Sequence, residues 1–296
     1  MEFIRIIFQF CDILEAILLT DDDCSMVRHE AAEALAAIGA EKSRTVIEQA
    51  MEKTESNLPE VYETCLLAKN LMDWKARGGH DNTDEEAPVA CACMTNPYSS
   101  RDPAPPHPAH ATKTAEELGD ILCNPELSIF DRYRAMFSLR NRGGEDSVLQ
   151  LCRSLSSDAS SALLRHEISY VLGQLQHPAS VPALEESLRK LEEHQMVRHE
   201  SAEALGAIEG SWERVEAILS EFTKDNNQVV RESCLVALDA ADYWGHNNAA
   251  PEDDGTNDED EEKKEVLSFV QQKALVAEDD RKGTKEVLNH RFNTTA

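Results

Sequence analysis

Residues 26–35 read MVRHEAAEAL and residues 196–205 read MVRHESAEAL, so two ten-residue stretches that lie 170 positions apart differ at one place. A second echo, ETCL at residues 63–66 and ESCL at residues 232–235, has an offset of 169 positions. Two separate blocks that share nearly the same offset are typical of an internal duplication. The sequence therefore predicts a molecule with two similar halves.

A shorter period runs through the second half, where arginine recurs at one constant interval, at Arg132, Arg165, Arg198 and Arg231. A leucine follows each arginine seven residues later, which is two helical turns along and on the same face of a helix. Helical repeats of this length are typical of solenoids. The sequence predicts an all-α solenoid of helical repeats in two pseudo-symmetric halves that are joined by a linker.

Changes in composition divide the chain into four predicted parts. Residues 1–75 form an incomplete N-terminal half, and residues 76–114, which are polar and rich in proline, form the linker. Residues 115–246 form the complete C-terminal half, and residues 247–296 hold an acidic tail and a terminal helix over about 263–288. Because the His-Glu pairs of the second half are separated by one full repeat, a partner of His29 would precede Met1. We therefore expect an N-terminally truncated or alternatively started form of a symmetric protein.

The charge of the chain limits its partners. With 29 Lys and Arg against 56 Asp and Glu, the net charge is −27, which disfavours nucleic acid and favours a basic partner. The eight cysteines have neither zinc-finger spacing nor the density of a disulfide scaffold, so we expect a reducing cytoplasm. The apolar start, residues 3–10, is too short and too interrupted by charge to span a membrane. We expect a monomer that binds no membrane.

Three His-Glu pairs occupy matching repeat positions, and they are His29-Glu30, His166-Glu167 and His199-Glu200. Imidazole and carboxylate together suit iron, manganese or zinc, and two histidines with one carboxylate leave open positions on ferrous iron. His166, His199 and Glu200 could form such a set, while Glu167 could bind the metal or hold a substrate amine by charge. The six residues of the three pairs are therefore the predicted metal ligands.

Other interpretations of the pairs remain open. A single His-Glu pair at a helix start is usually a solvated pair that complements the helix dipole, and common repeat ancestry could preserve all three. The zinc-protease pattern HExxH is absent, because Glu33 and Glu203 stand where it requires histidine. These two glutamates could be extra ligands, but helical geometry favours their orienting a neighbouring His or Arg, or facing solvent.

The three pairs, the stretch RYRAMFSLRN at residues 132–141 and the stretch VRESC at residues 230–234 together resemble the deoxyhypusine hydroxylase family. The resemblance covers most of residues 13–75 and 115–244. It implies a HEAT-like repeat fold and a di-iron monooxygenase with two Fe²⁺ ions and O₂ as co-substrate. It further implies that the substrate is the deoxyhypusine side chain of a translation initiation factor, whose hydroxylation completes hypusine.

The resemblance also implies roles for the pairs. One iron would take His166, His199 and Glu200, the other would keep His29 and Glu30, and Glu167 would contact the cationic side chain of the substrate. Because one iron would lack a histidine, we expect this form to be weakened or inactive relative to an intact hydroxylase. The alternatives are a non-catalytic HEAT-repeat scaffold that binds a basic protein partner, with vestigial metal motifs, and a metal-dependent lyase that acts on tetrapyrroles.

Overall fold

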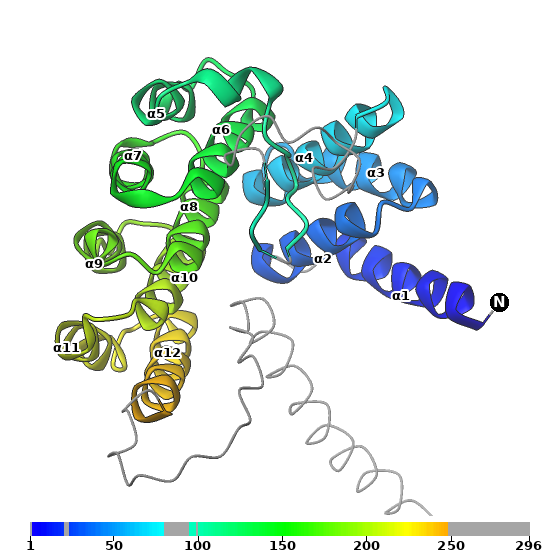
Figure 1. Ribbon diagram of the computed structural model, residues 1–296. Helices are drawn as coiled ribbons and strands as arrows, with labels where there is room; N and C mark the ends of the chain where they lie inside the picture. Colours follow the sequence, from blue (N-terminus) through cyan, green and yellow to red (C-terminus); the bar gives the residue numbers. More distant parts are fainter. Residues whose placement is uncertain (1, 21–23, 80–94, 99, 248–296) are drawn as a thin grey trace, which may run out of the picture.

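The computed structural model describes residues 2–20, 24–79, 95–98 and 100–247, and helices are the only regular structure within them (Figure 1). The predicted all-α repeat fold is confirmed. In the same ranges, no helix is both long enough and apolar enough to cross a membrane. The predicted acidic tail and terminal helix lie outside the described residues, apart from the last residue of the final helix.

The first array holds four α-helices, and their bounds are α1 (Glu2–Leu19), α2 (Ser25–Ile38), α3 (Arg44–Thr54) and α4 (Pro59–Ala76), with a short 3₁₀ helix η1 (Glu41–Ser43). Gly39 caps the C-terminal end of α2, and its φ of 66° is the left-handed conformation that glycine adopts without strain. Pro59 begins α4, a position where its missing N–H breaks no helical bond. Small and apolar side chains from all four helices, mostly from α2 and α4, form the core of this array.

The second array begins after the 3₁₀ helix η3 (Pro108–Thr112), and its helices are α5 (Ala115–Cys123), α6 (Ile129–Arg142), α7 (Gly144–Ser157), α8 (Ala162–Leu175), η4 (Pro178–Ser180), α9 (Val181–Arg189), α10 (Gln195–Ala207), α11 (Trp212–Phe222) and α12 (Gln228–Asn247). They stack in two rows, with α6, α8, α10 and α12 in one row and α5, α7, α9 and α11 in the other (Figure 1). Because α4 ends at Ala76 and α5 begins at Ala115, the described part of the predicted linker contains only η3 as regular structure. The four-part division itself stays a prediction.

Buried arginines connect some of the helices to the helix that precedes them. In three repeats the Nε atom donates to the carbonyl ten residues earlier, in the last turn of the preceding helix, where a helix leaves carbonyl groups unsatisfied. The three pairs are Arg28 to Leu18 at 3.1 Å, Arg132 to Leu122 at 2.8 Å and Arg198 to Leu188 at 2.9 Å. Two of the four evenly spaced arginines, Arg132 and Arg198, therefore make this bond, and Arg28 makes it in the first array.

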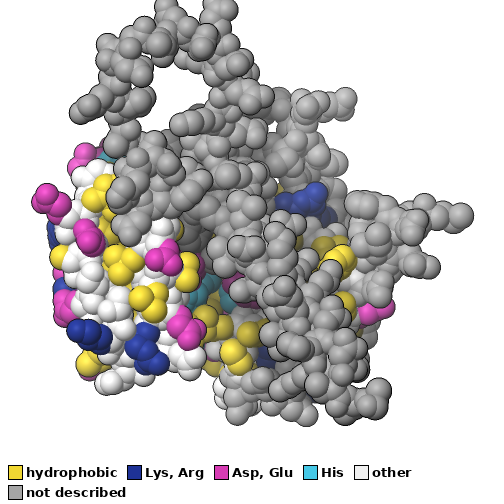
Figure 2. All heavy atoms as spheres, turned by 90° about the horizontal axis from the view of Figure 1, so that it is seen from below, with side chains coloured by type: hydrophobic (Ala, Val, Ile, Leu, Met, Phe, Trp, Pro, Cys, Tyr) yellow, Lys and Arg dark blue, Asp and Glu magenta, His cyan; other side chains and the backbone are white. Residues whose placement is uncertain are grey.

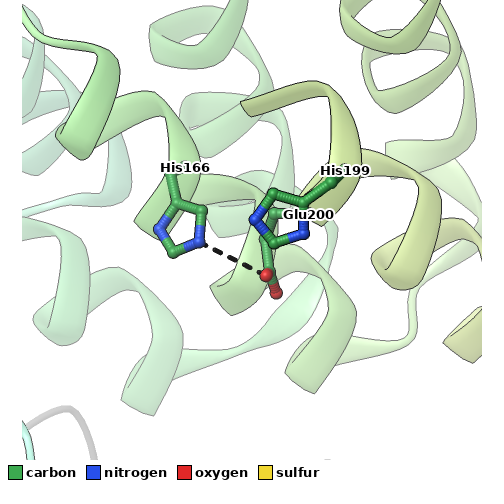
Figure 3. A group of neighbouring side chains, drawn as sticks. All are labelled: His166, His199 and Glu200. Carbon is green, nitrogen blue, oxygen red and sulfur yellow. Dashed lines mark ion pairs between the residues drawn. The ribbon is translucent and has the colours of Figure 1, made fainter. Parts of the chain in front are cut away.

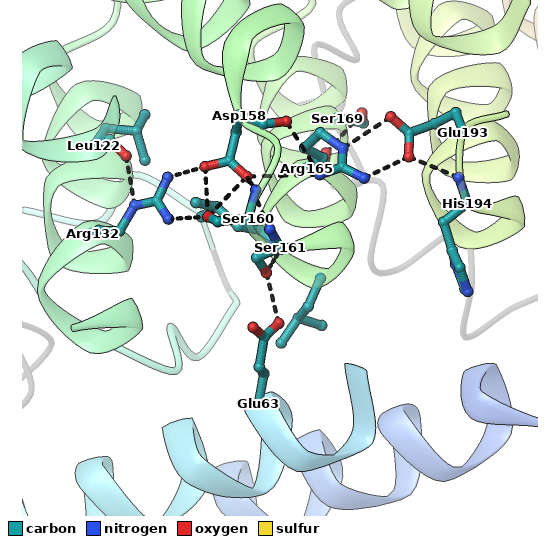
Figure 4. A network of polar contacts seen from close by, with 12 residues as sticks. Glu63, Leu122, Arg132, Asp158, Ser160, Ser161, Arg165, Ser169, Glu193 and His194 are labelled. Carbon is teal, nitrogen blue, oxygen red and sulfur yellow. Dashed lines mark hydrogen bonds and ion pairs between the residues drawn. The ribbon is translucent and has the colours of Figure 1, made fainter. Parts of the chain in front are cut away.

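Arg165 departs from this pattern and links two repeats instead (Figure 4). Its guanidinium donates to both carboxylate oxygens of Glu193, at 2.9 and 2.6 Å, and to the carbonyl of Asp158 at 3.2 Å. The Asp158 carboxylate in turn pairs with Arg132. A continuous chain of buried and partly buried charges thus runs along this end of the second array.

The two arrays pack against each other through α4. Leu67 and Leu71 of this helix belong to the same buried cluster as the core of the second array. At the rim of the contact, the Ser161 hydroxyl donates to a carboxylate oxygen of Glu63 at 2.6 Å (Figure 4). This contact brings α2 and α4 beside α8, so that the His-Glu pair of α2 lies opposite the pair of α8.

Two buried arginines of α6 bind the segment between the arrays: Arg134 donates to the carbonyls of Pro105 and Pro106, and Arg140 binds Asp102. Arg140 on α6 is 1% exposed, and its two terminal nitrogens donate to the two carboxylate oxygens of Asp102 at 2.8 and 2.7 Å. Its guanidinium also stacks on the rings of Phe137 and Tyr98, 4.6 and 5.1 Å from their centroids. A two-pronged pair of this kind fixes both position and orientation. Residues 100–106 are thereby placed between the arrays.

Candidate metal centre

All three His-Glu pairs stand at the same position of their helices. His29 is the fifth residue of α2, His166 the fifth of α8 and His199 the fifth of α10. In each case the pair lies within the first two turns, and stacking of the repeats places the turns of α8 and α10 side by side. The common register explains why equivalent residues converge on one place.

The pairs on α8 and α10 form a buried group (Figure 3). His166, His199 and Glu200 offer ligand atoms that all lie within 4.8 Å of one another, and all three residues are buried. The Nε2 atom of His166 is 3.4 Å from Oε2 of Glu200, and the two imidazole centroids are 5.5 Å apart. Two histidines and one carboxylate in this arrangement match the donor set of ferrous iron.

The hydrogen bonds of this group fit a bound cation. His199 donates from Nδ1 to the carboxylate of Glu203 at 3.3 Å, which leaves the Nε2 lone pair for a metal. The Nδ1 atom of His166 is buried and, among the described residues, has no hydrogen-bond partner. A buried polar atom in that condition costs about 1–3 kcal/mol. A fully buried carboxylate at Glu200 adds the need for positive charge nearby.

The pair on α2 forms a second group on the opposite side of the contact. The Nε2 atom of His29 lies 3.8 Å from the Glu30 carboxylate and 3.9 Å from the Glu33 carboxylate. The His29 and His166 rings meet edge to face, with centroids 5.1 Å apart. The structure therefore brings all three predicted histidines together, although His29 and His166 belong to different arrays. Glu30 is the outlying member, since 61% of its side chain is exposed.

Glu167 lies in the wall between the two groups. It is buried, and it lines a hollow together with His29, Glu33, Pro103 and Tyr133. Burial raises the pKa of its carboxyl group well above the usual range, and the negative charges of Glu33 and Glu200 raise it further. A positively charged group placed in the hollow would relieve this repulsion and favour the ionised carboxylate. Figure 2 shows histidine side chains beside acidic ones near the middle of the face seen from below.

Sequence reasoning missed several residues of this site. Thr64 holds the ring of His29, and Tyr133 and Pro103 form apolar parts of the hollow. Only Thr64 had a usable signal, because it occupies the position of Ser233 in the duplicated ETCL and ESCL stretches. Pro103 belongs to the linker, and the Arg140–Asp102 pair holds it at the site. No local sequence pattern predicts this position.

Comparisons with known proteins agree with this architecture. Residues 148–239 match the HEAT repeat family, and residues 27–53 match the PBS lyase HEAT-like repeat. Deoxyhypusine hydroxylase of Danio rerio is 48% identical over 233 residues, which is 78% of this chain and 70% of the relative. The chain belongs to the deoxyhypusine hydroxylase family. The corresponding protein of Drosophila melanogaster is 44% identical and is covered over 71% of its length by 79% of this chain.

A solved structure supports the family at the level of the fold. The human deoxyhypusine hydroxylase in complex with glycerol aligns with a TM-score of 0.68 and 42% sequence identity, over 79% of this chain and 74% of that one. The resemblance predicted from the His-Glu pairs is therefore confirmed, and the family is a family of enzymes. The likeness to the PBS lyase repeat concerns a single repeat, residues 27–53, whereas the hydroxylase relatives match across both arrays.

Proposed function

We propose that this protein hydroxylates the deoxyhypusine side chain of a translation initiation factor, using O₂ and a pair of Fe²⁺ ions, as the last step of hypusine formation. The observation that carries the proposal is that two groups of histidine and glutamate meet across the contact of the two arrays, with centroids of His29 and His166 5.1 Å apart. A two-metal site built from facing helices is a known device for oxygen chemistry.

Each array supplies the ligands of one metal in this proposal. His166, His199 and Glu200 hold the first ion, and His29 and Glu30 contribute to the second. Bound iron would supply the activation of O₂ for a reaction that puts one oxygen atom into a C–H bond of the substrate and releases the other as water, with two electrons and two protons from an external reductant.

Glu167 is the residue proposed to bind the substrate. Its buried carboxyl group shares the hollow with His29 and Glu33, so a cationic amine that entered there would lie beside the metal ligands. In a buried site, a charge-assisted hydrogen bond to that amine is stronger than at the surface. It would hold the reacting carbon in one orientation, which is the main contribution that positioning makes to such a reaction.

The remaining wall of the hollow keeps water away. Tyr133 and Leu163 are each 1% exposed and line the same hollow as Glu167. Because an apolar wall excludes water, it would limit side reactions between solvent and reactive intermediates. At longer range, the net charge of −27 would attract a basic substrate protein. The proposal places this chemistry in the cytoplasm, in a monomer.

The test begins with the whole chain, loaded anaerobically with Fe²⁺ and desalted, so that iron per chain can be counted. It is then given O₂, a reductant and the deoxyhypusine-bearing factor, and the factor is weighed by mass spectrometry. We expect a gain of one oxygen atom, more slowly than with a hydroxylase whose two metal groups each hold two histidines. No gain from a protein that carries two irons would refute the proposed function.

Two variants assign the residues. His199→Ala should lose iron and turnover, whereas His177→Ala, a histidine at the start of η4 outside the site, should lose neither. Glu167→Gln should keep the iron but bind the substrate more weakly, which appears as a raised KM at unchanged iron content. Normal hydroxylation by His199→Ala would contradict the assignment of the first metal.

A further inference from the structure

The ring of His29 is held in one protonation form by its neighbours. The Thr64 hydroxyl donates its single hydrogen to the carbonyl of Glu60 at 2.8 Å, so it can only accept from the Nδ1 atom of His29, 3.1 Å away. Nδ1 therefore carries the proton, and the lone pair of the neutral ring lies on Nε2. This lone pair points to the side where the carboxylates of Glu30 and Glu33 lie, at 3.8 and 3.9 Å.

In the second array, a different residue makes the hydrogen bond that orients the histidine ring. At His199, the hydrogen bond to Nδ1 is made by Glu203, the counterpart of Glu33 in the duplicated ten-residue stretch. The hydroxyl of Ser233, the counterpart of Thr64, donates to the carboxylate of Glu203 at 3.1 Å and does not hold the ring directly. In the second array the glutamate one turn after the histidine thus orients the ring through Nδ1. In the first array a threonine does so, and the glutamate lies on the Nε2 side.

We propose that Glu33 is a metal ligand, and that His29, Glu30 and Glu33 bind a divalent cation of the Fe²⁺ or Mn²⁺ class. This inference rests on the proposed function only in treating His29 as a ligand. Ligand bonds of about 2.1 Å allow two ligand atoms on one ion to be at most about 4.2 Å apart. The distances of 3.8 and 3.9 Å from Nε2 to the two carboxylates fall within that limit.

The surroundings of Glu33 agree with this role. The His29 side chain is 3% exposed, and the Glu33 side chain is 34% exposed, so an ion between them would have the imidazole on its buried side and an open side toward the hollow. Glu33 lines this hollow beside Glu167. One imidazole with two carboxylates is a harder donor set than the two imidazoles and one carboxylate of the other group, which favours Mn²⁺ and Fe²⁺ over softer ions. The two sites of the pair would therefore differ in affinity.

Titration of the metal-free full chain with Mn²⁺, followed by the EPR signal of the free ion, tests the assignment without any turnover. The wild-type protein should bind two ions. Glu33→Gln should retain one and weaken the other by about 100-fold or more, which exceeds the usual effect of residues that only orient a ligand. Glu33→His, which offers a nitrogen ligand at the same place, should restore the second ion.

The matched control is Glu203→Gln, because an amide oxygen at that position can still accept from Nδ1 of His199. It should keep both ions, with a change of less than about tenfold. The inference fails if Glu33→Gln binds as the wild-type protein does, or if Glu33→Gln and Glu203→Gln lose equal affinity. It also fails if Glu33→His does not restore the ion, or if the wild-type protein binds fewer than two ions. Two bound Mn²⁺ ions, one of which depends on Glu33, together with an iron-loaded protein that does not hydroxylate, would refute the proposed function and leave this site standing.

Discussion

The ion pair of Arg140 and Asp102 should contribute more to the free energy of unfolding than most other single contacts of this protein. The guanidinium is fully buried and the Asp102 side chain is 7% exposed, and two bonds of 2.7 and 2.8 Å join them. Removal of one partner leaves the other charge buried without its counter-charge. Loss of a buried partner costs about 3–5 kcal/mol, so we expect Arg140→Met to lower the free energy of unfolding by that amount.

A double-mutant cycle isolates the pair from the packing around it. Asp102→Asn keeps the shape of the side chain and should cost about 1.5–3 kcal/mol, and the double variant should cost about 2 kcal/mol less than the sum of the two single changes. Urea unfolding followed by far-ultraviolet circular dichroism gives all four free energies. The stacking of Arg140 on Phe137 and Tyr98 is lost in both Arg140 variants, so it cancels in the cycle.

The matched control for this cycle is an exposed pair of the same length. Arg153 lies 2.8 Å from Asp120, but 40% and 67% of the two side chains are exposed. Arg153→Met should therefore change the free energy of unfolding by less than about 1 kcal/mol. If Arg140→Met costs no more than Arg153→Met, or if the two changes at Arg140 and Asp102 are additive, burial of the pair does not fasten the linker.

Three further outcomes follow from buried positions elsewhere. Burial lowers the pKa of His110 to about 4, so below pH 6.5 the unfolded chain binds a proton more readily than the folded chain does. Acidification from pH 7 to 5 should therefore lower the unfolding free energy of the wild-type protein by about 1–2 kcal/mol more than that of His110→Asn. Equal losses in the two proteins would contradict this. A Cβ atom on Gly206 would lie 2.8 Å from a carbonyl oxygen of α12, so Gly206→Ala should destabilise by about 1–3 kcal/mol in urea titrations, and by more than Gly173→Ala, whose nearest contact is 3.2 Å. Burial raises the thiol pKa of Cys65 and Cys234 to about 12, so a disulfide reagent at pH 8 should label these two residues only after unfolding. Labelling of the folded protein would contradict this and show that α4 and α12 open.

Much of the architecture could be predicted from spacing alone. The constant interval between the arginines and the shared offset between the two halves are properties of the sequence, and they place His29, His166 and His199 at one position of three helices. Periodicity determines which face of a helix is buried, because the side chains of one face recur at every turn. For this reason the all-α repeat fold and the His-Glu pairs of the candidate site could be predicted without coordinates.

The tertiary structure decided how these repeated pieces meet. His29 and His166 lie far apart in the chain, in different arrays, and only the packing of α4 against the second array brings their rings to 5.1 Å. Glu33 and Glu203 are equivalent in sequence, yet one lies on the Nε2 side of its histidine and the other on the Nδ1 side. A local repeat sets the position of a side chain along its helix, but its rotamer and its partners depend on contacts with distant parts of the chain. The sequence therefore determined where the His-Glu pairs lie along their helices, and the packing of the two arrays determined which side chains face one another.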